Sequence, residues 1–215
     1  MLTLKLGSAE TPKSLLFLGA HPDDIEIGCG GTVIRLLKER RISKVTWVVF
    51  SGNTTRKREA RASASAFLKG VRNKTIITKS FRDGYFPYDG AIKDVFEELK
   101  SIVSPDIVFT HYRDDRHQDH RVISDLTWNT FRDHLVLEYE VPKYDGDLGS
   151  PNFFVPMNEL TYRNKANLIL EHFASQQSKR WFSEDTFLAL GRLRGVECSA
   201  PEDFAEAYYS RKLTV

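Results

Sequence analysis

Short apolar runs alternate with amphipathic stretches along most of the chain. These runs are too short for helices with a stable core face, so they predict buried strands at 15–19, 44–50, 74–79, 106–111 and 136–141. Apolar residues recur at helical spacing between them, most clearly over 92–103, where the pattern stops before a proline. Strands that alternate with amphipathic helices predict a Rossmann-like three-layer α/β/α sandwich with a mostly parallel sheet.

The rest of the chain predicts further helices and one irregular region. Helices are expected after a glycine turn at 28–31 and over about 60–68, 120–133, 159–174 and 184–193. Residues 141–157 break the pattern and predict a long loop that shapes or covers a pocket. The C-terminal tail is expected to be an exposed interface or a docked segment, through the aromatic residues Phe204, Tyr208 and Tyr209.

Composition narrows the possible functions. A chain of 215 residues that is 41% hydrophobic predicts one domain, 1–215, with its own core. The net charge of +2 gives no field that would attract nucleic acid, and no apolar run approaches a membrane span or a signal peptide. Cys29 and Cys198 do not make a disulfide framework, so we expect a cytoplasmic protein. A small-molecule substrate is the expected partner, and a homo-oligomer remains possible.

Two clusters of metal-binding side chains follow two of the expected strands. The first, at 21–24, is His-Pro-Asp-Asp, and the second, at 117–120, is His-Gln-Asp-His. Because open parallel sheets bind ligands at the carboxyl ends of their strands, we expect both clusters to lie in one crevice. The sequence therefore predicts two halves of one metal site.

The spacing within each cluster suits a catalytic divalent metal, which takes three protein ligands and leaves one position open to water. His21 and Asp24 are three residues apart on the turn that leaves the first strand, where both can face one ion. His117 and His120 are also three apart, at the start of a helix, and share a face. Either histidine could be the third ligand, and the spacing alone does not decide between them.

The remaining groups of the clusters suit hydrolysis. Asp23 could remove a proton from water at the ion, and the histidine that is not a ligand could donate to the oxyanion. Asp119 could hold one imidazole in the required tautomer.

Together these motifs carry a resemblance to a known family. The stretch Ala-His-Pro-Asp-Asp, followed by Gly-x-Gly-Gly-Thr and later by His-x-Asp-His, resembles the PIG-L/LmbE-like family of zinc-dependent N-deacetylases. The resemblance extends over nearly the whole chain. It implies hydrolysis of the N-acetyl group of an amino sugar, in a small glycoconjugate or a nucleotide-linked sugar, with release of acetate and a free amine.

The resemblance also implies a role for each residue of the clusters. It assigns zinc to His21, Asp24 and His120, with Asp23 as the general base; ligands of these types would also accept iron(II). It assigns His117 to the amide carbonyl or the tetrahedral intermediate, with Asp119 orienting that histidine.

Substrate contacts are expected in the loops around the crevice. Arg56 matches a family position at the mouth of the sugar site. Asp83 and Tyr85 follow the third expected strand and should reach the same crevice, and Arg116 directly precedes His117 at its rim.

Three other functions use a similar set of residues. They are a metal hydrolase of another amide or an ester, a non-haem iron(II) enzyme, and a sugar-binding protein that retains a metal without turnover. Asp23 beside the ligands has an obvious task only in hydrolysis. The presence of both Asp23 and His117 argues against a role in binding alone.

Overall fold

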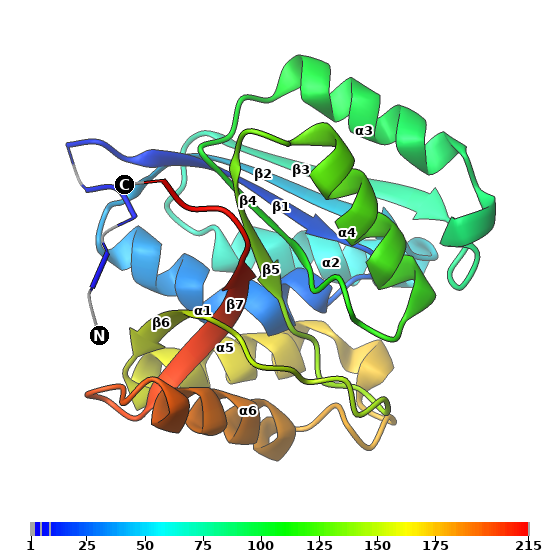
Figure 1. Ribbon diagram of the computed structural model, residues 1–215. Helices are drawn as coiled ribbons and strands as arrows, with labels where there is room; N and C mark the ends of the chain where they lie inside the picture. Colours follow the sequence, from blue (N-terminus) through cyan, green and yellow to red (C-terminus); the bar gives the residue numbers. More distant parts are fainter. Residues whose placement is uncertain (1–2, 5, 9, 215) are drawn as a thin grey trace.

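The computed structural model describes residues 3–4, 6–8 and 10–214. Its centre is a seven-stranded sheet in the order β3-β2-β1-β4-β5-β7-β6 (Figure 1). β7 (Phe204–Ser210) runs antiparallel to β5, and β6 (Phe153–Met157) runs antiparallel to β7 at the edge. Five neighbouring strands are parallel: β1 (Lys13–Gly19), β2 (Ile42–Ser51), β3 (Lys74–Phe81), β4 (Ile107–His111) and β5 (Leu135–Tyr139).

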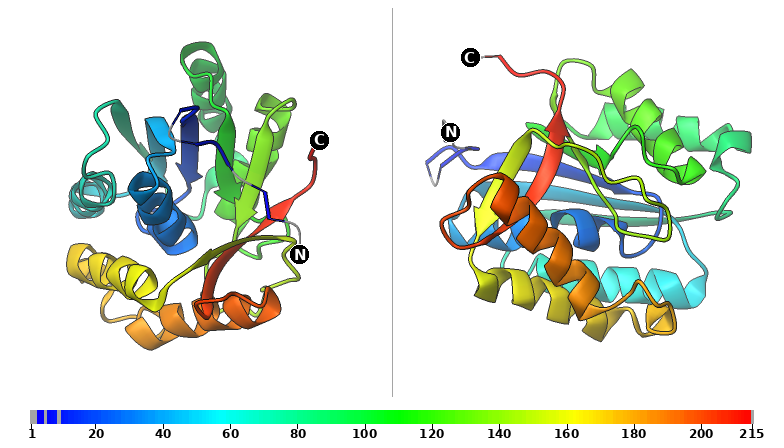
Figure 2. Two further views of the ribbon diagram at one scale, coloured as in Figure 1. Left: turned by 90° about the vertical axis from the view of Figure 1, so that its left-hand side faces the viewer. Right: turned by 60° about the horizontal axis from the view of Figure 1, so that its bottom comes forward.

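Helices cover both faces of the sheet, which confirms the predicted α/β sandwich (Figures 1 and 2). Alternate residues of β1 face opposite cores, Leu15 and Phe17 on one side and Leu16 and Leu18 on the other. One face carries α3 (Ala91–Ile102) and α4 (Gln118–Thr130). The other carries α1 (Asp24–Lys38), α2 (Thr54–Phe67), α5 (Glu159–His172) and α6 (Glu184–Glu197). Two short 3-10 turns are η1 (Phe86–Tyr88) and η2 (Ala174–Gln176).

The strand order reverses between β1 and β4. From β1 the chain continues to β2 and β3 on one side, and it then returns to add β4 and β5 on the other. Ligands bind in the crevice at such a switch point in open α/β sheets. The two predicted clusters follow β1 and β4, so the topology brings them together.

The expected glycine turn at 28–31 is wrong, because these residues lie inside α1. A Cβ atom at Gly28 would overlap the Tyr139 ring of β5, and one at Gly31 would overlap the Met157 sulfur of β6. Glycine in a helix interior costs about 1 kcal/mol relative to alanine. Here it allows α1 to approach the sheet closely.

Two strands in the C-terminal part were not predicted. β6 lies inside the expected loop and contains Pro156, which is tolerated because β6 is an edge strand. β7 was not predicted because a glutamate, Glu206, in the sequence suggests a solvent-exposed position. In the structure Glu206 is buried and pairs with buried Lys165. Of the two expectations for the tail, the docked segment is confirmed, because Phe204, Tyr208 and Tyr209 lie in a buried strand.

The cysteines agree with the expectation that they form no disulfide. Cys29 and Cys198 are both buried and unbonded, and Cys29 packs in the apolar core beneath α1. None of the helices in the described part of the chain is long and apolar enough to cross a membrane.

Candidate metal centre and active site

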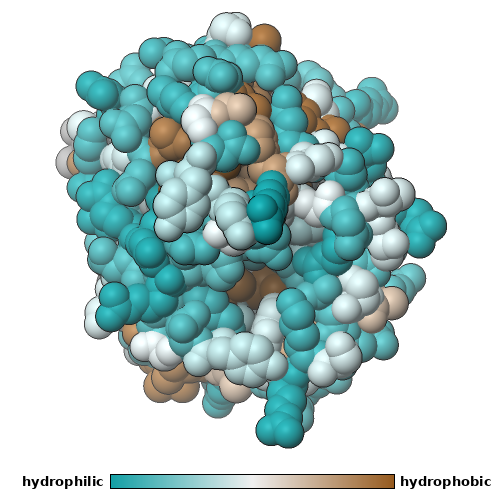
Figure 3. All heavy atoms as spheres, turned by 90° about the vertical axis from the view of Figure 1, so that its right-hand side faces the viewer, coloured by the Kyte–Doolittle hydropathy of each residue, from teal (hydrophilic) through white to brown (hydrophobic). Residues whose placement is uncertain are grey.

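A cavity of about 910 Å³ opens at the carboxyl ends of β1, β2 and β3. This face of the molecule is mostly hydrophilic and is hollowed near its middle (Figure 3). The size lies at the upper end of the range of about 300–1,000 Å³ that is typical of small-molecule sites. Both predicted clusters contribute to its walls, as do the loop after β3 and the segments 141–145 and 176–181.

A strained turn directs the first cluster toward the cavity. Asp23 has φ 102°, a value that is uncommon for a residue with a side chain. It occupies the N-cap position of α1, yet its side chain makes no capping hydrogen bond. A backbone conformation of this kind costs on the order of 1–3 kcal/mol. It is found most often at functional sites, where contacts with the surrounding structure stabilise it. The Asp23 carboxylate is thereby left for another task.

Three donor atoms from the two clusters form a compact triangle. His21 Nδ1 lies 3.1 Å from His120 Nε2, and Asp24 Oδ2 lies 3.4 Å from the first and 3.5 Å from the second. Ligands at 2.0–2.1 Å from a tetrahedral zinc ion are about 3.3 Å apart. These three atoms are spaced as the ligands of one divalent cation are. His21, His117 and His120 also lie close enough together to hold an ion.

Two further carboxylates, those of Asp119 and Asp115, contact the ring nitrogens of His21 and His120 that do not face Asp24. Asp119 Oδ2 lies 3.2 Å from His21 Nε2, and Asp115 Oδ2 lies 2.9 Å from His120 Nδ1. Histidines that bind metals usually donate their other ring N–H to such a group, which fixes the tautomer. The nitrogens that face Asp24 are then free to bind a cation.

The electrostatics of the centre favour a cation. Burial would raise the pKa of Asp24, but the imidazoles of His120, His111 and His21 outweigh it and hold that pKa well below its usual range. Burial and the neighbouring His111 lower the pKa of His120 to about 3. Asp24 is therefore ionised and His120 neutral at neutral pH, which are the states that metal ligands need.

His21 differs from the other ligands in its protonation. Burial opposes its charge, but Asp24, Asp119 and Asp83 surround the ring and raise its pKa well above the usual value. A metal would displace this proton, so binding should release a proton to solution.

His111 lies fully buried beneath the centre. Its ring stacks on His120 at 3.8 Å, and its Nε2 is 3.2 Å from Asp24 Oδ2. Asp24, His111 and His120 could also hold an ion. The backbone N–H of Ala20 donates to His111 Nε2 at 2.9 Å and occupies the lone pair that a metal would need. The set of His21, Asp24 and His120 therefore fits an ion better than the set with His111.

Asp23 directly precedes Asp24 of the triangle and, among the described residues, has one carboxylate oxygen free of hydrogen bonds. Its Oδ1 accepts from Arg56 Nη2 at 3.1 Å, and its buried Oδ2 has no hydrogen-bond partner within the described part of the chain. Burial raises the pKa of Asp23 to about 7, against the lowering effect of Arg56. A base is most effective when its pKa lies near the working pH. Arg56 lines the cavity but directs its guanidinium at Asp23 and the Pro22 carbonyl.

His117 lines the cavity beside the triangle. Its Nδ1 accepts from the backbone N–H of Asp119 at 3.3 Å, which leaves the proton of the neutral ring on Nε2. Burial and the neighbouring His21 lower the pKa of His117, so the ring is neutral at pH 7. The side chain is half-buried and lines the cavity.

The resemblance implied that the carboxylate of Asp119 orients His117. In the structure this carboxylate is bonded to other groups. It contacts His21 and accepts from the backbone N–H groups of Gly84 at 2.6 Å and Phe86 at 3.2 Å. These bonds satisfy the carboxylate, and they draw the loop after β3 against the metal centre. The hydrogen bond between Asp119 and His117 comes from the Asp119 backbone N–H.

Comparison with known proteins identifies the family. Residues 16–131 match the family model described as PIG-L, GlcNAc-PI de-N-acetylase. The chain belongs to the PIG-L family. The uncharacterized deacetylase YaiS of Escherichia coli (strain K12) is 31% identical over 150 residues, which cover 64% of this chain and 78% of YaiS. PIG-L deacetylases are metal-dependent, in agreement with the His/Asp cluster.

Solved structures share the PIG-L fold over almost the whole chain. The conserved protein TT1542 from Thermus thermophilus has a TM-score of 0.72 and 21% identity, with 94% of this chain and 96% of that chain covered. The N,N'-diacetylchitobiose deacetylase from Pyrococcus horikoshii has a TM-score of 0.68 and 21% identity, with 93% and 84% covered. At this level of identity these likenesses establish the fold alone.

The predicted substrate contacts of this PIG-L protein are only partly gathered at the site. Asp83 lines the cavity, and its Oδ1 lies 3.1 Å from His21 Nε2. Tyr85 and Arg116 do not line it. The Tyr85 ring is covered by the Arg82 guanidinium, 3.5 Å from the ring centroid, and the Arg116 side chain is exposed.

Several residues of the site were not predicted from the sequence. Asp115 was not predicted to contact a ligand imidazole, because the charged run 113–116 gives no periodic signal that one member turns inward. Its position, five residues before a ligand histidine, could have marked it as a partner of that imidazole. The others come from segments without a motif: Lys143, Lys179 and Trp181.

Asp115 should control the affinity for metal. We expect Asp115→Asn to weaken metal binding by about 10- to 100-fold, because His120 loses the carboxylate that fixes its tautomer. Titration with zinc against a chelating indicator measures the change. Asp114→Asn, at the exposed neighbouring position, is the matched control and should bind zinc as the wild type does. Equal affinities for the two variants would contradict the role of Asp115.

Proposed function

We propose that this protein is a metal-dependent hydrolase that removes the N-acetyl group of an amino sugar and releases acetate and a free amine. The observation that carries the proposal is the triangle of His21, Asp24 and His120, with the unpartnered Oδ2 of Asp23 beside it. A site for binding alone does not need a strained, buried base. Membership of the PIG-L family and the name of YaiS support the same reaction.

The protein groups divide the reaction between them. When bound, a divalent cation would polarise the acetamide carbonyl and acidify a water molecule. Asp23 accepts the proton of the attacking water and passes it to the departing amine, while Arg56 holds its carboxylate in place. His117 donates from Nε2 to the oxygen that gains negative charge. Asp119 and Asp115 keep the ligand imidazoles oriented.

Acetate release from zinc-loaded and metal-stripped protein tests the proposal. The panel should contain N-acetylated sugars, their conjugates and nucleotide sugars, together with an N-acetyl amino acid and an acetyl ester. Zinc-dependent acetate from an amino sugar supports the deacetylase, and acetate from only the last two would indicate a hydrolase of another amide or an ester. Tight zinc and sugar binding without acetate would indicate a binding protein.

The dependence on pH should report the state of Asp23. The pKa of Asp23 is raised to about 7 without metal, and a bound cation would lower it, so the rate should fall below pH 7 as the base becomes protonated. The Arg56 guanidinium favours the ionised form, so Arg56→Met should shift this acid limb to higher pH. The ratio of the rates at pH 6 and pH 8 measures the shift, and an unchanged ratio would exclude this coupling.

A further inference from the structure

Two consecutive side chains at the start of α4 bind the loop after β3. The Asp119 carboxylate accepts from the backbone N–H groups of Gly84 and Phe86. Gln118 Nε2 donates to the Gly84 carbonyl at 2.5 Å. A carbonyl oxygen only accepts hydrogen bonds, so the Gln118 amide presents its NH2 group to the loop. Both backbone polar groups of Gly84 are thus bonded to the first turn of α4.

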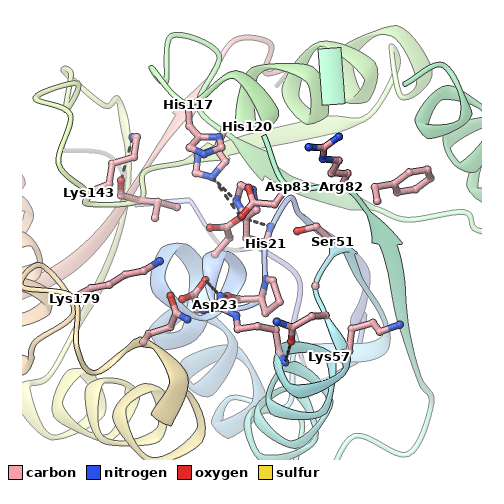
Figure 4. Close-up of a pocket in the computed structure, with 18 of the residues that line it drawn as sticks. His21, Asp23, Ser51, Lys57, Arg82, Asp83, His117, His120, Lys143 and Lys179 are labelled. Atoms are coloured by element: carbon pink, nitrogen blue, oxygen red, sulfur yellow. Dashed lines mark hydrogen bonds and ion pairs between the residues drawn. The ribbon is translucent and has the colours of Figure 1, made fainter. Parts of the chain in front are cut away.

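Gly84 directly follows the part of this loop that faces the cavity. Arg82 and Asp83 line the cavity, and Figure 4 shows Asp83 beside His21. The Asp83 side chain is 75% exposed, yet its Oδ1 lies 3.1 Å from His21 Nε2. Because an exposed side chain has few packing contacts, the position of the backbone decides where the Asp83 carboxylate lies. The hydrogen bonds at Gly84, one residue away, fix that backbone.

The Gln118 side chain is bonded to the loop and lies outside the cavity wall. It is exposed, and within the described residues its amide makes a hydrogen bond only to Gly84. Asp119, in contrast, contacts His21 as well as the loop, so its replacement would disturb a metal ligand at the same time. Replacement of Gln118 therefore tests the attachment of the loop separately from the metal centre.

We propose that Gln118 is a positioning residue, which holds the Asp83 carboxylate where a substrate bound at the metal centre meets it. This inference rests on the proposed deacetylase function and on the predicted contact between Asp83 and the substrate. Gln118 does not touch the reacting atoms and acts through Gly84 on Asp83. Loss of a contact that is equal in the ground state and the transition state raises KM and leaves kcat unchanged. Loss of the Gln118 amide should have this effect and leave zinc affinity unchanged.

Two substitutions remove the amide and retain the start of α4. Leucine has a similar size, and proline is favoured at the first position of a helix, which Gln118 occupies. His117, the preceding residue, has φ −72° and ψ 121°, an extended conformation that suits a following proline. The matched control is Gln177→Leu, because Gln177 Nε2 also donates to a backbone carbonyl, that of Leu170 at 3.1 Å. Gln177 is exposed and does not line the cavity.

Limited digestion of the zinc-loaded protein with trypsin measures the attachment of the loop without any catalysis. Trypsin cleaves after arginine, so the bond between Arg82 and Asp83 reports how often the loop opens. Release of the loop should raise the rate of cleavage at this bond by about threefold or more in Gln118→Leu and Gln118→Pro. Gln177→Leu should be cleaved there as the wild type is. Equal rates in all four proteins, or an equal rise in the Gln177 variant, overturn the inference.

A double-mutant cycle then tests whether Gln118 acts through Asp83. The substrate is the methyl glycoside of N-acetylglucosamine, and the variants are Gln118→Leu, Asp83→Ala and the two combined. Loss of one hydrogen bond at position 118 should raise KM by about 3- to 10-fold. The double variant should have the KM of Asp83→Ala alone, because a residue that acts only through Asp83 has no effect in its absence.

The outcomes separate this inference from the proposed function. Effects on KM that multiply in the double variant, an unchanged KM in Asp83→Ala, or weaker zinc binding by Gln118→Leu overturn the role of Gln118 and leave the deacetylase intact. If even the wild type releases no acetate, the proposed function fails, and the role of Gln118 toward the substrate fails with it, whatever the rate of cleavage by trypsin. Melting temperatures of the variants exclude unfolding as the cause.

Discussion

Asparagine at position 23 should lower the rate of acetate release by a factor of about 100 to 10,000, the usual contribution of a general base. The amide nitrogen and oxygen of asparagine cannot accept the proton that the carboxylate takes from water. Asparagine also has nearly the same size and adopts positive φ readily, so the turn at φ 102° should remain. The variant should therefore stay folded, and it should bind one zinc ion through His21, Asp24 and His120.

Two measurements give this prediction a sharp control. Elemental analysis should find the same zinc content in Asp23→Asn and the wild type, because the proposed ligands are His21, Asp24 and His120. Asp145→Asn is the control, because it removes a carboxylate from the same cavity at an exposed position. The rate of acetate release by Asp145→Asn should stay within about threefold of the wild-type rate. A rate for Asp23→Asn above a tenth of the wild type would contradict the role of base, and loss of zinc would make Asp23 a ligand.

The sequence predicted the half of the site that depends on short spacing. His21, Asp23 and Asp24 lie within four residues after a buried strand, and the turn alone brings them to one edge of the sheet. The alternation of strands and helices then predicted that the His-Gln-Asp-His cluster would meet them. The sequence does not decide which of the two histidines is the third ligand, because they are only three residues apart at the N-terminus of α4, His117 as its N-cap and His120 in its first turn.

The remaining features depend on contacts between distant parts of the chain. Whether Asp119 contacts His21 or His117 is decided by the loop after β3, whose N–H groups compete for the same carboxylate. Lys179 reaches the cavity from a segment with no periodic pattern. β7 was missed because Glu206 interrupts its apolar alternation, and the sequence does not indicate that a lysine elsewhere would neutralise it.

That buried pair braces the helix that carries the metal site. Lys165 Nζ lies 2.6 Å from Glu206 Oε1 and donates to the Ile27 carbonyl at 2.6 Å. The same carboxylate accepts from the backbone N–H groups of Gly31 at 2.8 Å and Thr32 at 2.7 Å. α5 and β7 are thus tied to the glycine-rich middle of α1, behind the end that bears Asp23 and Asp24.

Lys165→Met should cost about 3–5 kcal/mol of the free energy of unfolding, because it leaves the Glu206 charge buried without its partner. For a chain of this length each kcal/mol lowers the melting temperature by about 2–4 °C, so a decrease of about 10 °C is expected. Thermal unfolding of the metal-free protein measures it without the contribution of bound zinc. The replacement of both members, Lys165→Met with Glu206→Leu, should recover part of the loss, since it removes the unpaired charge as well.

Lys93→Met provides the matched comparison, since it makes the same substitution in an ion pair on the surface. Lys93 and Glu97 lie one turn apart on α3, with side chains 43% and 53% exposed, and pairs of this kind contribute about 0.3–0.5 kcal/mol. If Lys165→Met and Lys93→Met unfold at the same temperature, the buried pair is not the brace of α1. If Lys165→Met alone is destabilised, the hydrogen bonds of Lys165 and Glu206 to the α1 backbone explain why this helix is stable despite its three glycines.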